Sequence, residues 1–123
     1  MMILDTSAVI ELLRGTGKGK EIQKMLDHNA ALVTSITVNE ALVGEKNNRE
    51  QVINFLKEIN VLSFDGDAAW RSVELEEELY KKGKPLTKLD LYIASICLVN
   101  NVPLVSTDKG FQSVEGLKLL LVS

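Results

Sequence analysis

Four acidic residues in this chain stand close to the ends of short apolar runs or to the starts of the segments that follow them. Asp5 comes directly after the apolar residues 2–4, and Asp108 follows another such run. Glu40 lies early in the helix expected after a second strand, and Asp90 lies near the start of a strongly apolar helix. In an open parallel sheet, ligands bind beyond the carboxyl ends of the strands. We therefore expect all four carboxylates at one edge of a sheet.

Each of these acids also has a simpler interpretation as a helix cap. The segments 37–40 and 87–90 have the Thr-x-x-acid spacing of a capping box, the second with Asp in place of Glu. Asp5 and Asp108 stand where an acid favours the start of a helix. Asp90 needs a further explanation, because it lies between two leucines in the most apolar helix. An unpaired buried carboxylate is costly, so Asp90 should have a partner.

A metal site explains the four acids together. Carboxylates about 4 Å apart repel by roughly 1 to 4 kcal/mol per pair, so a cation is needed to hold several of them in one place. The single His28 and the single Cys97 exclude zinc sites built from clusters of His and Cys. Carboxylate oxygens select hard ions, so we expect Mg²⁺ or Mn²⁺. Such a site predicts metal-assisted hydrolysis of a phosphodiester.

The elements that must position these acids alternate along the chain. Short apolar runs typical of buried strands occupy residues 2–4, 31–35, 61–64, 102–106 and 117–122, with helical patterns between them. These strands are continuously apolar rather than alternating, which is typical of a sheet covered on both faces. We therefore predict an α/β fold, a three-layer α/β/α sandwich with a mainly parallel five-stranded sheet.

Amphipathic patterns predict which helix faces are buried. The first helix should end at the glycine-rich segment 15–20, which we expect to be a flexible loop. The long helix after the third strand is expected to run through Trp70, Val73 and Leu79 and to stop at residues 82–85. The helix over residues 87–100 is apolar on nearly every side and should therefore be buried.

Length and composition place the chain in a broad class. It has 123 residues, of which 46% are hydrophobic and 25% charged, and we expect a single domain over residues 1–123 rather than a disordered chain. There is no membrane-length apolar run and no targeting segment, so we expect a soluble cytoplasmic protein without a membrane partner. The net charge of −3 argues against a protein that coats nucleic acid, but not against a nucleic-acid enzyme.

Four segments spread over the whole chain carry a resemblance. They are Ile3-Leu4-Asp5-Thr6-Ser7-Ala8-Val9-Ile10, Thr37-Val38-Asn39-Glu40-Ala41, Asp90-Leu91-Tyr92-Ile93-Ala94 and Thr107-Asp108-Lys109-Gly110-Phe111. In this order they resemble the signature segments of the PIN-domain ribonucleases, especially the small VapC-type toxins of bacteria and archaea. The resemblance implies a five-stranded parallel sandwich and a Mg²⁺- or Mn²⁺-dependent endoribonuclease acting on RNA. It also implies a homodimer, and inhibition by a cognate antitoxin protein as in type II toxin-antitoxin pairs.

The same resemblance assigns roles to individual residues. The matches to the family's catalytic and metal-binding acids are Asp5, Glu40, Asp90 and Asp108. The residues implied to orient ligands or water are Thr6, Ser7 and Thr107. The chain departs from the family pattern twice, because Ser7 stands where Asn is frequent and Gly110 replaces a second acid before the Phe.

Two alternatives remain open. A catalytically inactive domain of the same fold could serve as an RNA-binding or assembly module. A phosphorylatable receiver domain has a similar length and alternation of elements. Receivers, however, need an acid pair after the first strand and a phosphoacceptor Asp after the third. Here Asp5 is alone, and Asp65 opens what resembles an ordinary helix cap.

Overall fold

The computed structural model describes residues 1–123 and contains one five-stranded sheet. All strand pairs are parallel, and the strand order is β3-β2-β1-β4-β5. The strands are β1 (Met2–Leu4), β2 (Ala31–Thr34), β3 (Asn60–Leu62), β4 (Leu104–Ser106) and β5 (Leu119–Leu121). The prediction of a five-stranded parallel sheet is confirmed.

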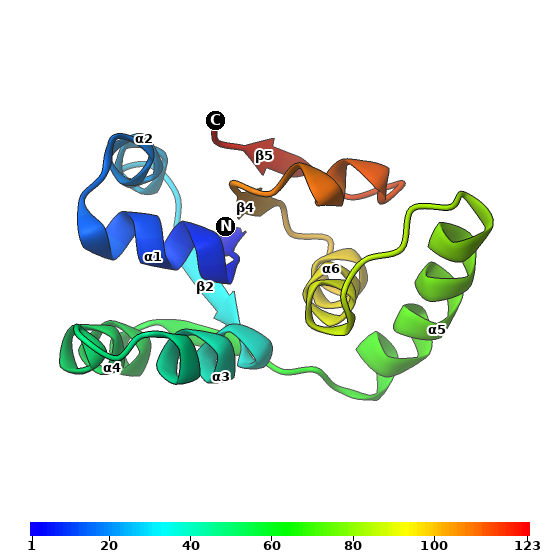
Figure 1. Ribbon diagram of the computed structural model, residues 1–123, viewed down its shortest axis with the longest axis horizontal. Coiled ribbons are helices and arrows are strands. Elements are labelled where there is room, and N and C mark those ends of the chain that lie inside the picture. The colour runs from blue at the N-terminus through cyan, green and yellow to red at the C-terminus, as the bar shows by residue number, and fades with distance from the viewer.

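Helices cover both faces of this sheet. They are α1 (Thr6–Arg14), α2 (Gly17–Leu26), α3 (Ser35–Gly44), α4 (Arg49–Glu58), α5 (Gly66–Lys81), α6 (Lys88–Asn100) and the short 3-10 helix η1 (Lys109–Ser113). One core cluster joins α1 to α4 to one face of the sheet, and a second joins α5, α6 and η1 to the other. In Figure 1 these two groups of helices lie on opposite sides of the molecule. The three-layer prediction is therefore confirmed.

The central position of β1 determines where the candidate residues meet. Ile3 pairs with Leu32 of β2 on one side and with Leu104 of β4 on the other. Since the three strands are parallel, they end at the same edge of the sheet, at Leu4, Thr34 and Ser106, and Asp5 directly follows β1. Helix α6 leads back into β4, so its N-terminal turn also lies near this edge.

The segment 15–20 is not the flexible loop that the glycines predict. Gly15 ends α1 in the left-handed conformation with φ 65°, Thr16 caps α2, and α2 begins at Gly17. A Cβ at Gly19 would lie 2.1 Å from the backbone oxygen of Glu11. The glycine at this position therefore allows α1 and α2 to approach closely rather than making the chain flexible.

Helix α5 runs through the expected residues, but it does not bury all of its apolar side chains. Leu79 is buried, but Trp70 is 77% exposed and Val73 is 52% exposed. The helix instead buries a face built from Ala68, Ser72, Leu75 and Leu79. Two small residues and two leucines thus bring α5 against the core, whereas Trp70 and Val73 face outward.

Helix α6 agrees with its prediction over most of its length. Residues 93–97 are all buried, and the exposed apolar residues of the helix, Leu89 and Val99, lie toward its two ends. No helix in the structure combines the length and the apolar character needed to span a membrane.

Candidate metal and catalytic site

The edge of the sheet where β1 and β4 end carries Asp5, Glu40, Asp90 and Asp108, and we call it the acidic edge. Asp5 lies on it directly after the central strand β1 and is 4% exposed. It is the N-cap of α1, and its Oδ1 accepts hydrogen bonds from the Ala8 N–H at 2.8 Å and the Ser7 hydroxyl at 2.7 Å. Its Oδ2 accepts the Ser106 hydroxyl at 2.5 Å. The capping interpretation is confirmed, but a cap requires only the Ala8 bond. The two serine hydroxyls fix the carboxylate further.

The pKa of Asp5 shows that its charge is incompletely compensated. Burial raises the pKa above its ordinary value, and the hydrogen bonds from Ser106, Ser7 and the Ala8 N–H only partly oppose this effect. The negative charge of Asp108 raises the pKa further. A cation at this edge would offset both the cost of burying the Asp5 charge and the repulsion between Asp5 and Asp108.

Glu40 is held by α1 rather than by a capping box. Helix α3 begins at Ser35 because the Thr34 hydroxyl caps it, accepting the Thr37 N–H at 3.3 Å. The predicted box between Thr37 and Glu40 is therefore wrong, because the helix starts earlier and Thr37 lies inside it. The Glu40 Oε1 instead accepts a 2.7 Å hydrogen bond from Thr6 Oγ1, which also lies 3.2 Å from Thr37 Oγ1.

Asp90 lies half-buried in the first turn of α6. Thr87 caps this helix as predicted, and its hydroxyl accepts the Asp90 N–H at 3.4 Å. No salt bridge in the structure includes Asp90, and the neighbouring Lys88 pairs with Glu76 at 2.6 Å. The expected protein partner for Asp90 is therefore not a basic residue.

The pKa of Asp90 links the four acids. Burial is the main cause that raises it, and the hydrogen bond from Thr87 opposes the rise. The negative charges of Asp108, Glu40 and Asp5 each raise the pKa further. The carboxylate of Asp90 is thus repelled by all three of the other candidate acids.

Asp108 occupies the exposed rim of this edge. It caps η1, and its Oδ1 accepts the Gly110 N–H at 2.8 Å. Its own N–H donates to Ser106 Oγ at 2.9 Å. The capping role of Asp108 is therefore confirmed, and the Ser106 hydroxyl connects its backbone to Asp5.

The type of ligand indicates which metal this set would suit. All four candidates are carboxylates, the single His28 is exposed beyond the end of α2, and the single Cys97 is buried. Such an oxygen-only set suits Mg²⁺ or Mn²⁺. In this conformation no three acidic, His or Cys side chains are close enough to hold one ion. An ion would therefore require the less buried carboxylates to rotate toward Asp5.

Comparison with known proteins gives the family. The model of the family described as PIN domain matches residues 2–117. This chain belongs to the PIN domain family. It is 27% identical to "Ribonuclease VapC" of Rickettsia bellii, over 98% of this chain and 96% of that protein.

Two further comparisons extend the likeness of this PIN domain. It is 32% identical to "Ribonuclease VapC3" of Methanocaldococcus jannaschii, over 76% of this chain and 95% of that protein. A solved "Toxin-antitoxin complex from Klebsiella pneumoniae" contains a chain with the same fold. The TM-score is 0.82 at 22% identity, over 100% of this chain and 98% of that chain.

The PIN assignment and the geometry of Asp65 together argue against a receiver domain. Asp65 is an exposed N-cap of α5, and its Oδ1 accepts the Ala68 N–H at 2.9 Å. A residue in this ordinary capping role needs no phosphoryl chemistry to explain it.

Ser106 is a residue of the acidic edge of this PIN domain that was not predicted from the sequence. It is fully buried at the end of β4 and contacts both Asp5 and the backbone of Asp108. The signal available in the sequence was a polar residue at the end of an apolar strand. Among the residues expected to orient ligands, Thr6 and Ser7 donate hydroxyl hydrogen bonds to Glu40 and Asp5. Thr107 instead donates its backbone N–H to Ser7 Oγ at 3.2 Å.

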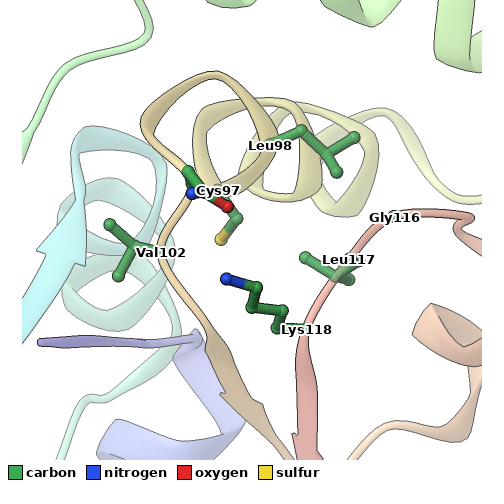
Figure 2. A pocket seen from close by; sticks show the side chains of 7 residues that line it. Cys97, Leu98, Val102, Gly116, Leu117 and Lys118 are labelled. Atoms are coloured by element: carbon green, nitrogen blue, oxygen red, sulfur yellow. The ribbon is translucent and has the colours of Figure 1, made fainter.

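A small cavity lies at the opposite end of α6 from Asp90 (Figure 2). Its volume of about 10 Å³ suffices for one water at most. Burial raises the pKa of the Cys97 thiol beside it to about 12, so this thiol is protonated at neutral pH and is a poor nucleophile. The residues that line the cavity are Cys97, Leu98, Asn101, Val102, Gly116, Leu117 and Lys118.

Proposed function

We propose that this PIN domain is a Mg²⁺- or Mn²⁺-dependent endoribonuclease and the toxin of a type II toxin-antitoxin pair. The observation that carries the proposal is the acidic edge itself. A buried Asp5 lies there among carboxylates that raise the pKa of Asp90 by repulsion. The likeness to proteins named ribonuclease, over almost the whole chain, supports the reaction class.

The metal ligands in this proposal are Asp5, Glu40, Asp90 and Asp108. A bound Mg²⁺ or Mn²⁺ supplies activation of water and neutralisation of phosphate charge. Asp5 is the fixed ligand, because three hydrogen bonds hold its carboxylate. Thr6 holds Glu40, and Asp108 is the ligand exposed to solvent at the rim of the site.

RNA would reach this site from the open side of the edge. Asp108 and the adjacent Lys109 are both exposed there, so a phosphate can approach a carboxylate-bound ion beside a free cation. The same placement serves a substrate that enters from solvent rather than through a closed cavity. We place the activity in the cytoplasm, in keeping with an RNA substrate.

The partner proteins in this proposal are a cognate antitoxin and a second copy of the chain. The fold shared with a toxin-antitoxin complex supports the first. Co-expression with the product of an adjacent open reading frame, followed by co-purification, tests the antitoxin. Light scattering on the purified chain tests the homodimer.

The decisive experiment measures RNA cleavage by the purified chain. We expect cleavage that requires Mg²⁺ or Mn²⁺, stops with EDTA, and is lost in Asp5→Asn and Asp90→Asn while circular dichroism shows a retained fold. Asp65→Asn is the matched control, because Asp65 is also a helix cap but lies outside the site. Cleavage at the normal rate by either site variant, free of contaminating nuclease, contradicts the assignment.

A second candidate, the inactive module, is favoured by one observation. No three ligand side chains converge in this conformation, as expected for a vestigial site. Calorimetric titration with Mn²⁺ separates the two, because an active site must bind the ion. Heat of binding that disappears in Asp90→Asn supports the enzyme, and its absence in the unaltered chain supports the module.

A further inference from the structure

Two serine hydroxyls each connect Asp5 to the backbone that follows β4. Ser7 donates to Asp5 Oδ1 at 2.7 Å and accepts the Thr107 N–H at 3.2 Å. Ser106 donates to Asp5 Oδ2 at 2.5 Å and accepts the Asp108 N–H at 2.9 Å. A backbone N–H can only donate, so each hydroxyl must direct its proton to the carboxylate. The direction of all four hydrogen bonds is therefore determined.

The hydrogen bonds also distinguish the two oxygens of Asp5. An ionised carboxylate has about four acceptor positions, two on each oxygen. Oδ1 accepts from both Ser7 and the Ala8 N–H, so its positions are filled. Oδ2 accepts only from Ser106 and keeps one position open. Oδ2 is thus the atom of Asp5 that remains available to a cation.

The two bridges join parts of the chain that are distant in sequence. The Ser106 bridge spans 101 residues to Asp5, and the Ser7 bridge spans 100 residues to Thr107. Strand pairing at this point does not depend on them, because the Asp5 N–H also donates to the Val105 carbonyl at 3.1 Å. Removing a hydroxyl should therefore leave the sheet intact.

Helix capping does not explain this arrangement. The cap on α1 is the bond from the Ala8 N–H to Asp5, and it needs neither serine. Ser106 is fully buried, and its hydroxyl contacts two candidate ligand residues, Asp5 and Asp108. The bridges restrain the carboxylate and the following turn relative to each other.

We propose that Ser7 and Ser106 are positioning residues that hold Asp5 and the turn at Asp108 as one unit, with Oδ2 of Asp5 presented to the divalent ion. This inference rests on the proposed function, because it assumes that the acidic edge binds a metal. Its structural half, the pair of bridges, exists without the metal and can be measured separately.

Amide hydrogen exchange tests the bridges in the metal-free protein. In EDTA, Ser7→Ala should speed hydrogen exchange of the Thr107 amide about fivefold to tenfold, and Ser106→Ala should speed exchange of the Asp108 amide by a similar factor. In each variant the amide loses the serine hydroxyl that accepts its hydrogen bond. The matched control is Ser95→Ala. It removes an equally buried hydroxyl that bonds only to the Leu91 carbonyl, and it should change neither amide.

Titration with Mn²⁺ tests the positioning role. Ser7→Ala and Ser106→Ala should each weaken Mn²⁺ binding about 10- to 100-fold and lower kcat for RNA cleavage with little change in KM. Ser7→Thr keeps the hydroxyl at a half-buried position and should restore both. Ser95→Ala should bind Mn²⁺ as the unaltered chain does.

The outcomes separate this inference from the proposed function. Alanine variants that bind Mn²⁺ as tightly as the active unaltered chain overturn the inference alone. Failure of Ser7→Thr to restore binding lost in Ser7→Ala also overturns it, because the effect would not belong to the hydroxyl. An unaltered chain that neither binds Mn²⁺ nor cleaves RNA overturns the proposed function and the inference together.

Discussion

Thr6 Oγ1 donates a 2.7 Å hydrogen bond to Glu40 Oε1 and so ties the first residue of α1 to the interior of α3. Thr6→Val keeps the shape of the side chain and removes the donor. We expect RNA cleavage to fall about tenfold or more, while the free energy of unfolding changes by about 1 kcal/mol or less. Steady-state kinetics and urea unfolding measure the two effects. Thr6→Ser, which keeps the hydroxyl, should behave like the unaltered chain, and equal loss in both variants would contradict this role.

Asp90→Asn should stabilise the metal-free protein while abolishing cleavage. The substitution removes a half-buried charge that Asp108, Glu40 and Asp5 all repel. We expect the melting temperature in EDTA to rise by a few degrees, measured by calorimetry. Active sites often combine lost stability with function in this way. A lower melting temperature than that of the unaltered chain would mean that repulsion at Asp90 is not a net cost.

The stability of the metal-free protein should depend on pH through the same acids. Folding raises the pKa of Asp5 and Asp90 above the value of 3.8 that applies when they are unfolded. Between 3.8 and the raised values the folded state binds more protons, so the free energy of unfolding contributed by these groups falls as pH rises. Urea unfolding in EDTA at several pH values measures this. The stability gained by Asp90→Asn should therefore grow with pH through this window, and a gain that shrinks would refute the sign.

Gly19→Ala should destabilise the protein, because the added Cβ would meet the Glu11 carbonyl oxygen at 2.1 Å. Overpacking of this kind costs about 1 to 3 kcal/mol or more. Gly17→Ala in the same helix is the control, since its Cβ meets nothing within 4 Å. It should be neutral or stabilising by up to about 1 kcal/mol. Equal effects of the two substitutions in urea unfolding would show that α1 and α2 can separate freely.

Trp70 should report directly on the outer face of α5. It is the only tryptophan and is 77% exposed, so iodide should quench its fluorescence efficiently in dilute solution. Trp70→Ser should cost about 0.5 kcal/mol or less, whereas Leu75→Ala, on the buried face, should cost about 2 to 5 kcal/mol. Quenching that weakens as protein concentration rises would place a second copy on this face.

Much of the fold could be predicted because its signals are local. The apolar runs located all five strands, and the nearly uniform apolar character of α6 predicted its burial. The start of α3 could not be located in this way. Thr34, Ser35 and Thr37 are all suitable caps, and the choice of Thr34 depends on where β2 stops pairing with β3. That pairing involves residues distant in sequence.

The candidate site likewise contains residues that local sequence signals predict and a residue that only the fold reveals. The four acids could be proposed from sequence because Asp5 and Asp108 follow strands, Asp90 opens a helix and Glu40 lies in the helix after β2, so the alternation of elements places them at one edge. Ser106 could not, because its role exists only when β4 lies beside β1 and brings its hydroxyl to Asp5. The buried face of α5 could not be predicted either, since Ala68 and Ser72 contribute too little hydrophobicity to mark it.

β1 is the central strand of the sheet, and one of its two neighbours, β4, is made only after β2, β3 and α6. A ribosome must therefore release the segment through Asp108 before Ser106 and Asp108 can join Asp5, which lies 101 residues before Ser106. For a chain proposed to be toxic, copies that end between Asp90 and β4 would carry three of the four acids without the strand that brings Ser106 to Asp5, and we expect them to be harmless to the cell that makes them.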